Sequence, residues 1–103
     1  MAPLKSVVRE YAGLTCRVID ALPAGTTPRL GVVFCHGYGA SGTDLVPLAQ
    51  ALFQAEPALM EGVQFCFPEA PLSLADMGMP GGRAWWHLSL QRLQQQLTQR
   101  RFH

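Results

Sequence analysis

The chain has 103 residues, with Lys+Arg 8 against Asp+Glu 7 and a formal net charge of +1. Apolar residues make up 49% and charged residues 15%, which is typical of a folded domain and excludes a disordered segment. The near-neutral balance, with no run of like charges, argues against a nucleic-acid partner. We expect one domain over residues 1–103.

The sequence also gives evidence on membrane insertion and on the cellular compartment. Its longest apolar run, residues 30–35, is far shorter than the ~20 residues that a membrane span needs, and the N-terminus lacks the apolar core of a signal peptide. The 3 cysteines are an odd number and form no C-x-x-C pair. This pattern favours reduced thiols and a cytoplasmic protein without stable membrane insertion.

The first segments predict an antiparallel hairpin. Residues 7–11 and 14–21 are strand-like, and Ala12-Gly13 between them is a turn signal. Residues 30–35 follow, apolar at every position apart from one glycine, as expected of a central strand covered on both faces. Their Cys35, like Cys66 further on, is expected in the core.

A strand–helix–strand unit is predicted next. Asp44 can cap a helix reaching Ala55, with Pro47 in its first turn and Glu56-Pro57 ending it. Residues 63–67 form the next strand, parallel to the first. The expected apolar stripe of the helix is Leu45, Leu48, Leu52 and Phe53. Residues 72–83 are expected to be loop, and residues 88–101 a helix with Leu90, Leu93 and Leu97 on one face.

The glycine-rich turn at residues 37–42 has two chemical interpretations. Its G-x-G-x-x-G spacing, after a strand and before a helix, is typical of a dinucleotide-binding turn. That motif needs an acidic residue about 20 positions further on, and Glu69 lies later than this. We keep a non-catalytic dinucleotide-binding domain that uses Gly37 to Gly42 as the alternative hypothesis.

In the second interpretation, the turn supplies an oxyanion hole. The strand ends in His36-Gly37, and backbone N–H groups freed after it can stabilise the oxyanion of acyl transfer. Glycine permits such an approach, which a side chain would hinder. A turn that needs glycine only for its backbone conformation remains a third possibility.

Three blocks in this order resemble one known family. The blocks are residues 31–44 (GVVFCHGYGASGTD), 67–71 (FPEAP) and 81–86 (GGRAWW). Together they resemble the N-terminal half of the phospholipase/carboxylesterase family of α/β-hydrolases, which includes the acyl-protein thioesterases. The resemblance implies an α/β fold, specifically the N-terminal part of an α/β-hydrolase sheet: an antiparallel hairpin, then parallel strands with crossover helices. On this basis residues 1–103 are a single partial domain.

The resemblance also implies residue roles. Tyr38 would lend its backbone N–H to the oxyanion hole, and Trp85 and Gly39 would line the substrate cleft. His36, Gly37 and Gly42 would shape the turn, so His36 would be structural and not the base. The substrate would be a small ester or thioester, hydrolysed without a metal or organic cofactor.

The residues that would complete a serine hydrolase are missing from this sequence. The family's nucleophile stands in G-x-S-x-G, and no such motif occurs in the 103 residues. Ser41 lies in Gly39-Ala40-Ser41-Gly42-Thr43, which lacks the final glycine. A triad of Ser41, Asp76 and His87 has no support from spacing. We therefore expect the chain to be inactive by itself.

Overall fold

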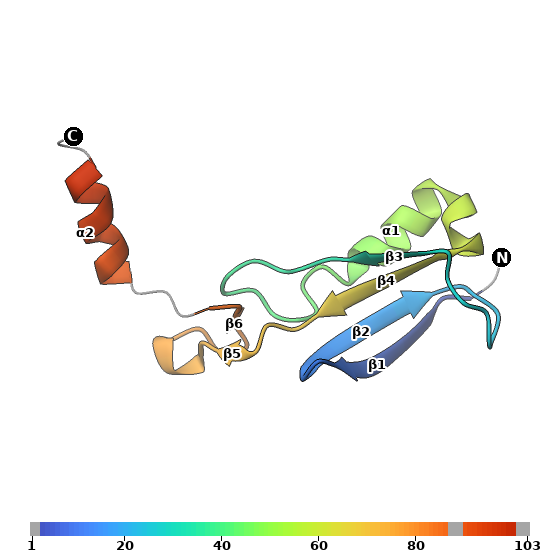
Figure 1. The fold of residues 1–103 in the computed structure, drawn as a ribbon, viewed down its shortest axis with the longest axis horizontal. Helices are drawn as coiled ribbons and strands as arrows, with labels where there is room; N and C mark the ends of the chain where they lie inside the picture. Colours follow the sequence, from blue (N-terminus) through green and yellow to red (C-terminus); the bar gives the residue numbers. More distant parts are fainter. Residues whose placement is uncertain (1–2, 87–89, 101–103) are drawn as a thin grey trace.

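The computed structural model describes residues 3–86 and 90–100. Within these ranges the protein is a small mixed α/β domain with a four-stranded sheet of order β1-β2-β4-β3, a short β5-β6 pair and two α-helices (Figure 1). The elements are β1 (Lys5–Tyr11), β2 (Leu14–Asp20), β3 (Leu30–Val33), α1 (Pro47–Ala55), β4 (Val63–Pro68), β5 (Leu72–Ser73), β6 (Arg83–Ala84) and α2 (Leu90–Arg100), with 3₁₀ turns at Pro57–Glu61 and Ala75–Met77.

The predicted hairpin is confirmed. β1 and β2 pair antiparallel, with Tyr11 opposite Leu14. The two residues between them, Ala12 and Gly13, have φ of 53° and 81°. Two consecutive positive φ values are typical of a type I′ turn, whose twist matches the twist of the strands that it joins.

The parallel crossover is confirmed as well. β3 and β4 pair parallel, with Val32 opposite Phe65, and α1 lies between them in the chain. β4 also pairs antiparallel with β2, which places it in the interior of the sheet. The hairpin and the parallel pair thus share a single sheet.

Helix α1 begins later than predicted. It starts at Pro47 with Val46 as its N-cap residue, and no side chain caps it, so the expected cap by Asp44 is wrong. Leu48 N donates to Leu45 O at 2.9 Å and Ala49 N donates to Val46 O at 3.1 Å, and these i to i−3 bonds are typical of turns and tightened helix ends rather than of a regular α-helix. Residues 41–46 instead form turns, with Asp44 N donating to Ser41 O at 3.2 Å. The predicted end is correct, since Glu56 is the C-cap.

The core lies between α1 and one face of the sheet. Phe53 and Ala49 of α1 are almost completely buried, whereas Leu48, expected on the apolar stripe, is 40% exposed. The Phe53 ring lies 5.0 Å from the Phe65 ring between centroids. The buried cluster consists of Ile19, Ala49, Phe53, Val63, Phe65 and Phe67.

The expectation that β3 is covered on both faces is wrong. β3 lies at the edge of the four-stranded sheet, and its Leu30 and Val33 are 56% and 60% exposed. Cys35 is exposed and Cys66 half-buried, so neither is the core residue expected. Val33 and Cys66 are paired on the face opposite Phe65, which α1 does not cover within the described residues, whereas Leu30 lies on the Phe65 face and is exposed because it is at the sheet edge.

The segment after β4 is more ordered than predicted. β5 and β6 pair antiparallel, with Leu72 opposite Ala84. Helix α2 stands away from the sheet in Figure 1, and its Leu93 and Leu97 are 37% and 53% exposed. The predicted helix ends at residues 88–89 and 101 lie outside the described residues. The radius of gyration is 17.8 Å, against roughly 13 Å for a compact domain of this length.

Candidate active site

The turn after β3 leaves one backbone donor unpaired. Ala40 N donates to Gly37 O at 3.2 Å, and Gly39 has a φ of 84°, which together indicate a type II turn over residues 37–40. Gly39 N donates to Arg83 O at 2.9 Å. Among the described residues, no group accepts the N–H of Tyr38. The predicted oxyanion donor therefore has no partner within the described part of the chain.

The structure requires glycine at some positions of this turn and not at others. Gly39 needs its positive φ, and a Cβ at Gly42 would lie 2.6 Å from the Cβ of Glu69. At Gly37 the φ is not positive, and a Cβ added there would meet no described atom within 4 Å apart from those of its chain neighbours. The described structure therefore explains Gly39 and Gly42 but gives Gly37 no packing role, and the position of a Gly37 side chain is open.

His36 is buried, with 4% exposed surface, and both of its ring nitrogens are engaged. Ala70 N donates to Nε2 at 3.0 Å, so Nε2 is an acceptor and carries no proton. Nδ1 lies 2.9 Å from Gly37 O and is therefore the protonated nitrogen, donating to that carbonyl. A histidine held in this tautomer by two backbone partners acts as a brace for the turn and has no free nitrogen for general-base work.

Trp85 and Arg83 form further hydrogen bonds that stabilise the turn after β3. The indole Nε1 of Trp85 donates to His36 O at 2.8 Å, and the two rings lie 5.3 Å apart between centroids. Arg83 N donates to Ala40 O at 3.0 Å, while its side-chain Nε donates to Ala70 O at 3.0 Å. Arg83 stands in the GGRAWW block, but no role was predicted for it from the sequence.

The start of α1 and the position of Glu69 argue against the alternative hypothesis of a dinucleotide-binding turn. A dinucleotide turn presents its pyrophosphate to a helix N-terminus, but α1 begins only at Pro47, beyond the glycine motif. Glu69, the acidic residue considered for the ribose, packs its side chain against Gly42, and its N–H donates to Thr15 O at 2.8 Å. Glu69 therefore has a structural position at the end of β4.

The Tyr38 side chain contributes a separate feature. Its hydroxyl oxygen is buried and has no hydrogen-bond partner within the part of the chain that the structure describes. Met79 lies close by the same turn, with its sulfur 3.3 Å from the position of a Cβ on Gly39. The described residues therefore give the Tyr38 hydroxyl no partner that would position or activate it.

The structure gives no geometric support for a triad of Ser41, Asp76 and His87. Ser41 is exposed, and its Oγ lies 3.3 Å from Thr43 Oγ1, where either hydroxyl can donate. Asp76 is exposed in the 3₁₀ turn Ala75–Met77. His87 lies outside the described residues. No described base contacts Ser41.

The three cysteines share one sheet face. Cys66 lies opposite Val18 in the β2–β4 register and opposite Val33 in the β3–β4 register. Burial, followed by the neighbouring thiols of Cys16 and Cys35, raises the pKa of the Cys66 thiol to about 11. A thiol that keeps its proton at neutral pH is a poor nucleophile. Within the described residues, no group of three or more His, Cys, Asp or Glu side chains could hold a metal ion.

No protein-family model matches the chain, and no curated protein matches it in sequence. In the described ranges, no helix combines the length and the apolar character that a membrane crossing requires. The candidate site consequently depends on its own geometry: a free N–H at the end of a parallel strand, beside an open glycine and a tryptophan.

Proposed function

We propose that the chain is the oxyanion-hole part of a cytoplasmic serine hydrolase resembling the phospholipase/carboxylesterase family, acting on carboxylic ester or thioester bonds. The observation that carries the proposal is the unpaired Tyr38 N–H at the carboxyl end of β3. Such a donor, on the loop between a parallel strand and its crossover helix, is one half of the oxyanion hole in α/β-hydrolases.

Each residue of the turn then has a defined part in acyl transfer. When a serine attacks the acyl carbonyl, its oxygen gains negative charge, and the Tyr38 N–H stabilises that charge. Gly37 leaves space for the approaching carbonyl, while His36 and Arg83 hold the turn in place. Trp85 supplies an apolar wall for the acyl group, and no cofactor enters the reaction.

The nucleophile, its acid and its base would come from chain segments outside these 103 residues. In the proposed α/β-hydrolase sheet, the next strand carries the nucleophile and pairs beside β3. The edge position of β3 and the exposed Leu30 and Val33 support this arrangement, because they leave a free apolar edge there. The confirmed hairpin followed by a parallel crossover is also the order expected at the start of such a sheet.

Replacing Tyr38 by proline tests the donor directly. Proline fits the second position of a type II turn and removes the N–H alone from the backbone. In a fusion of this chain to the G-x-S-x-G-containing half of a phospholipase/carboxylesterase, Tyr38→Pro should lower kcat on p-nitrophenyl esters by roughly 10²–10³. Tyr38→Ala and Tyr38→Phe keep the N–H and should retain most of the activity.

Equal rates for the proline and alanine variants would contradict the backbone assignment. A large loss in Tyr38→Phe would instead assign the chemistry to the hydroxyl. The 103-residue chain by itself should show no esterase activity. Turnover that survives purification and disappears in Ser41→Ala would revive the triad of Ser41, Asp76 and His87 and overturn the proposal.

A further inference from the structure

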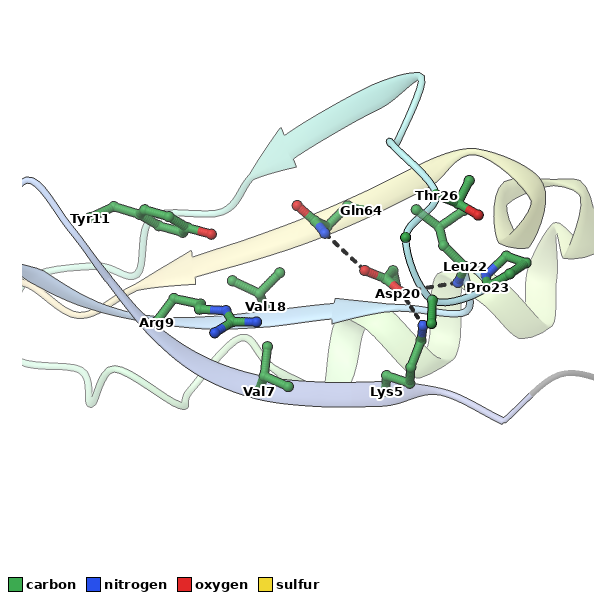
Figure 2. A pocket seen from close by; sticks show the side chains of 12 residues that line it. Lys5, Val7, Arg9, Tyr11, Val18, Asp20, Leu22, Pro23, Thr26 and Gln64 are labelled. Atoms are coloured by element: carbon green, nitrogen blue, oxygen red, sulfur yellow. Dashed lines mark hydrogen bonds and ion pairs between the residues drawn. The ribbon is translucent and has the colours of Figure 1, made fainter.

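A cavity of about 340 Å³ lies on the sheet face opposite α1, away from the turn after β3. Its floor includes Val7 and Val18, which are directly paired between β1 and β2, and Gln64 of β4 (Figure 2). Residues 22–26 form one rim. The volume falls in the range of about 300–1,000 Å³ typical of small-molecule sites.

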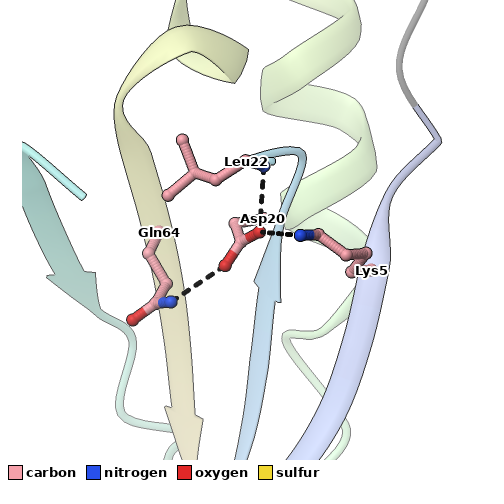
Figure 3. A network of polar contacts seen from close by, with 4 residues as sticks. All are labelled: Lys5, Asp20, Leu22 and Gln64. Carbon is pink, nitrogen blue, oxygen red and sulfur yellow. Dashed lines mark hydrogen bonds and ion pairs between the residues drawn. The ribbon is translucent and has the colours of Figure 1, made fainter. Parts of the chain in front are cut away.

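Asp20 is the single acidic residue among the described residues that line the cavity, and both of its carboxylate oxygens already have partners. Asp20 Oδ2 accepts from Gln64 Nε2 at 2.8 Å, and its Oδ1 accepts from Leu22 N at 3.0 Å (Figure 3). The Lys5 ammonium lies 3.9 Å from the same Oδ1. This network offsets the negative charge of Asp20 locally and fixes Gln64 and the start of the rim.

Arg9 is the basic residue of the cavity that has no acidic partner among the described residues. It lines the cavity from β1, and Figure 2 shows its side chain beside Val18. No described residue forms an ion pair or hydrogen bond with its guanidinium. With Lys5 and Arg9 against one satisfied carboxylate, the cavity has a net positive charge. A planar guanidinium with free N–H groups is suited to bidentate binding of a carboxylate or phosphate.

The rim adds backbone donors and apolar surface. Thr26 N donates to Pro23 O at 3.1 Å and Gly25 has a φ of 79°, so residues 23–26 form a second type II turn. The N–H groups of Ala24 and Gly25 have no acceptor within the described ranges. Leu22 and Pro23 complete the apolar part of the wall with Val7 and Val18.

We propose that this cavity binds a small organic anion: a carboxylate or phosphate group held by Arg9, attached to an apolar group that contacts Val7, Val18 and Leu22. The cavity contains none of the residues of the turn after β3, so the proposal stands independently of the esterase function. Carboxylate and phosphate share the recognition chemistry, and the choice between them is made by titration.

Calorimetric titration of the 103-residue chain with benzoate, phenyl phosphate and inorganic phosphate tests the site. We expect one of the two aromatic anions to bind with a Kd of roughly millimolar or tighter, and inorganic phosphate to bind more weakly because it lacks the apolar group. In ¹H–¹⁵N spectra, the amide signals of Ala24 and Gly25 should move with the titration, while that of Tyr38 should not.

Arg9→Gln should weaken binding at least tenfold, and Arg9→Lys should weaken it less, because lysine keeps the charge without the planar fork. Arg17→Gln is the matched control. Arg17 is the neighbour of Val18 on β2 and so points to the other face, where its Nη1 donates to Ser6 Oγ at 3.4 Å. Circular dichroism of each variant verifies that the sheet is intact.

Three results would overturn the proposal. They are the absence of binding by either aromatic anion, an equal loss of affinity in Arg17→Gln and Arg9→Gln, and shifts spread over all basic residues, which indicate nonspecific ion binding. If Arg9→Gln fails to fold, the location of the amide shifts in the unmodified chain decides the question.

Discussion

The indole N–H of Trp85 donates to the carbonyl oxygen of His36 across 2.8 Å. This bond joins the GGRAWW block to the end of β3. His36 is in turn joined to the FPEAP block, since Ala70 N donates to its Nε2 at 3.0 Å. The three blocks that carry the family resemblance therefore meet around one turn, although they are distant in the sequence.

Trp85→Phe should loosen this junction. Phenylalanine keeps an aromatic ring beside His36 but cannot donate a hydrogen bond, so the carbonyl of the buried His36 loses its partner. We expect the free energy of unfolding to fall by about 1 kcal/mol, measured by urea denaturation. Trp86→Phe is the control, since Trp86 is 61% exposed and its replacement should leave the stability nearly unchanged. Equal losses in the two variants would contradict a structural role for the bond.

Two glycines of the turn should respond differently to alanine. In Gly42→Ala the new Cβ would lie 2.6 Å from the Cβ of Glu69, so the end of β4 must shift, and we expect a loss of about 1–3 kcal/mol. Gly37→Ala places its methyl group in open space and should cost less than about 0.5 kcal/mol. Thermal or urea unfolding of both variants measures the contrast.

A similar loss in both glycine variants would show that Gly37 also needs its glycine for folding. Gly37 would then no longer support the proposal that this position leaves space for the substrate carbonyl. In the fused enzyme, by contrast, Gly37→Ala should lower kcat although it leaves the stability unchanged, because the methyl group occupies the space proposed for the carbonyl.

The sequence correctly predicted the hairpin turn, the helix end and the parallel crossover, but not the edge position of β3 or the start of α1. The Ala12-Gly13 turn and the helix end at Glu56 depend on nearby residues whose conformational preferences are strong, and both are confirmed. The edge position of β3 was missed because an apolar run looks the same in a central strand and in an edge strand. The late start of α1 was missed because Leu48 and Ala49 donate to the carbonyls three residues before them, a turn geometry that the apolar pattern does not distinguish from a regular helix.

The candidate site shows the same division. The sequence indicated His36 as a turn residue, but its tautomer depends on Ala70, which follows the far end of β4. Arg83 was missed because its function lies in bonds to the carbonyls of Ala70 and Pro71, which no sequence pattern reveals. The cavity beside Arg9 needs residues of β1, β2, β4 and a loop, so only the folded sheet defines it.

The thiols should differ in reactivity. Cys35 is exposed and Cys16 is buried, while the pKa of half-buried Cys66 is raised to about 11. At pH 8, iodoacetamide should therefore modify Cys35 first and Cys66 much more slowly, because the thiolate is the reactive form. Mass spectrometry of digested protein at successive times measures the order. Faster modification of Cys66 than of Cys35 would contradict the packing of this face.

The raised pKa also predicts a pH dependence of stability. The folded chain holds the Cys66 proton more tightly than the unfolded chain, whose thiol titrates near its ordinary value of 9.0. The resulting stabilisation is complete below pH 9 and decreases as the pH rises toward 11. Urea unfolding at pH 8 and pH 10 should show this decrease, and Cys66→Ala should reduce it. An unchanged slope in Cys66→Ala would assign the effect to other groups.

The two edges of the sheet differ in their protection against association. β1 carries Lys5, Arg9 and Glu10, and charged side chains on an edge strand discourage pairing with other chains. β3, by contrast, has the sequence LGVV, with Leu30 and Val33 56% and 60% exposed. An uncharged, apolar edge is a template for further strands. A domain of this size has only about 5 kcal/mol of stability to oppose such pairing.

We therefore expect the isolated chain to associate through β3 at micromolar concentration, as measured by light scattering coupled to size-exclusion chromatography. Val33→Lys should reduce this association, because it places a charge on the exposed edge without entering the core. Val8→Lys on β1 is the matched control, since Val8 is 53% exposed and lies on the opposite edge. A monomer at this concentration would contradict the prediction. Equal effects of the two lysines would assign the association to general surface hydrophobicity rather than to the β3 edge.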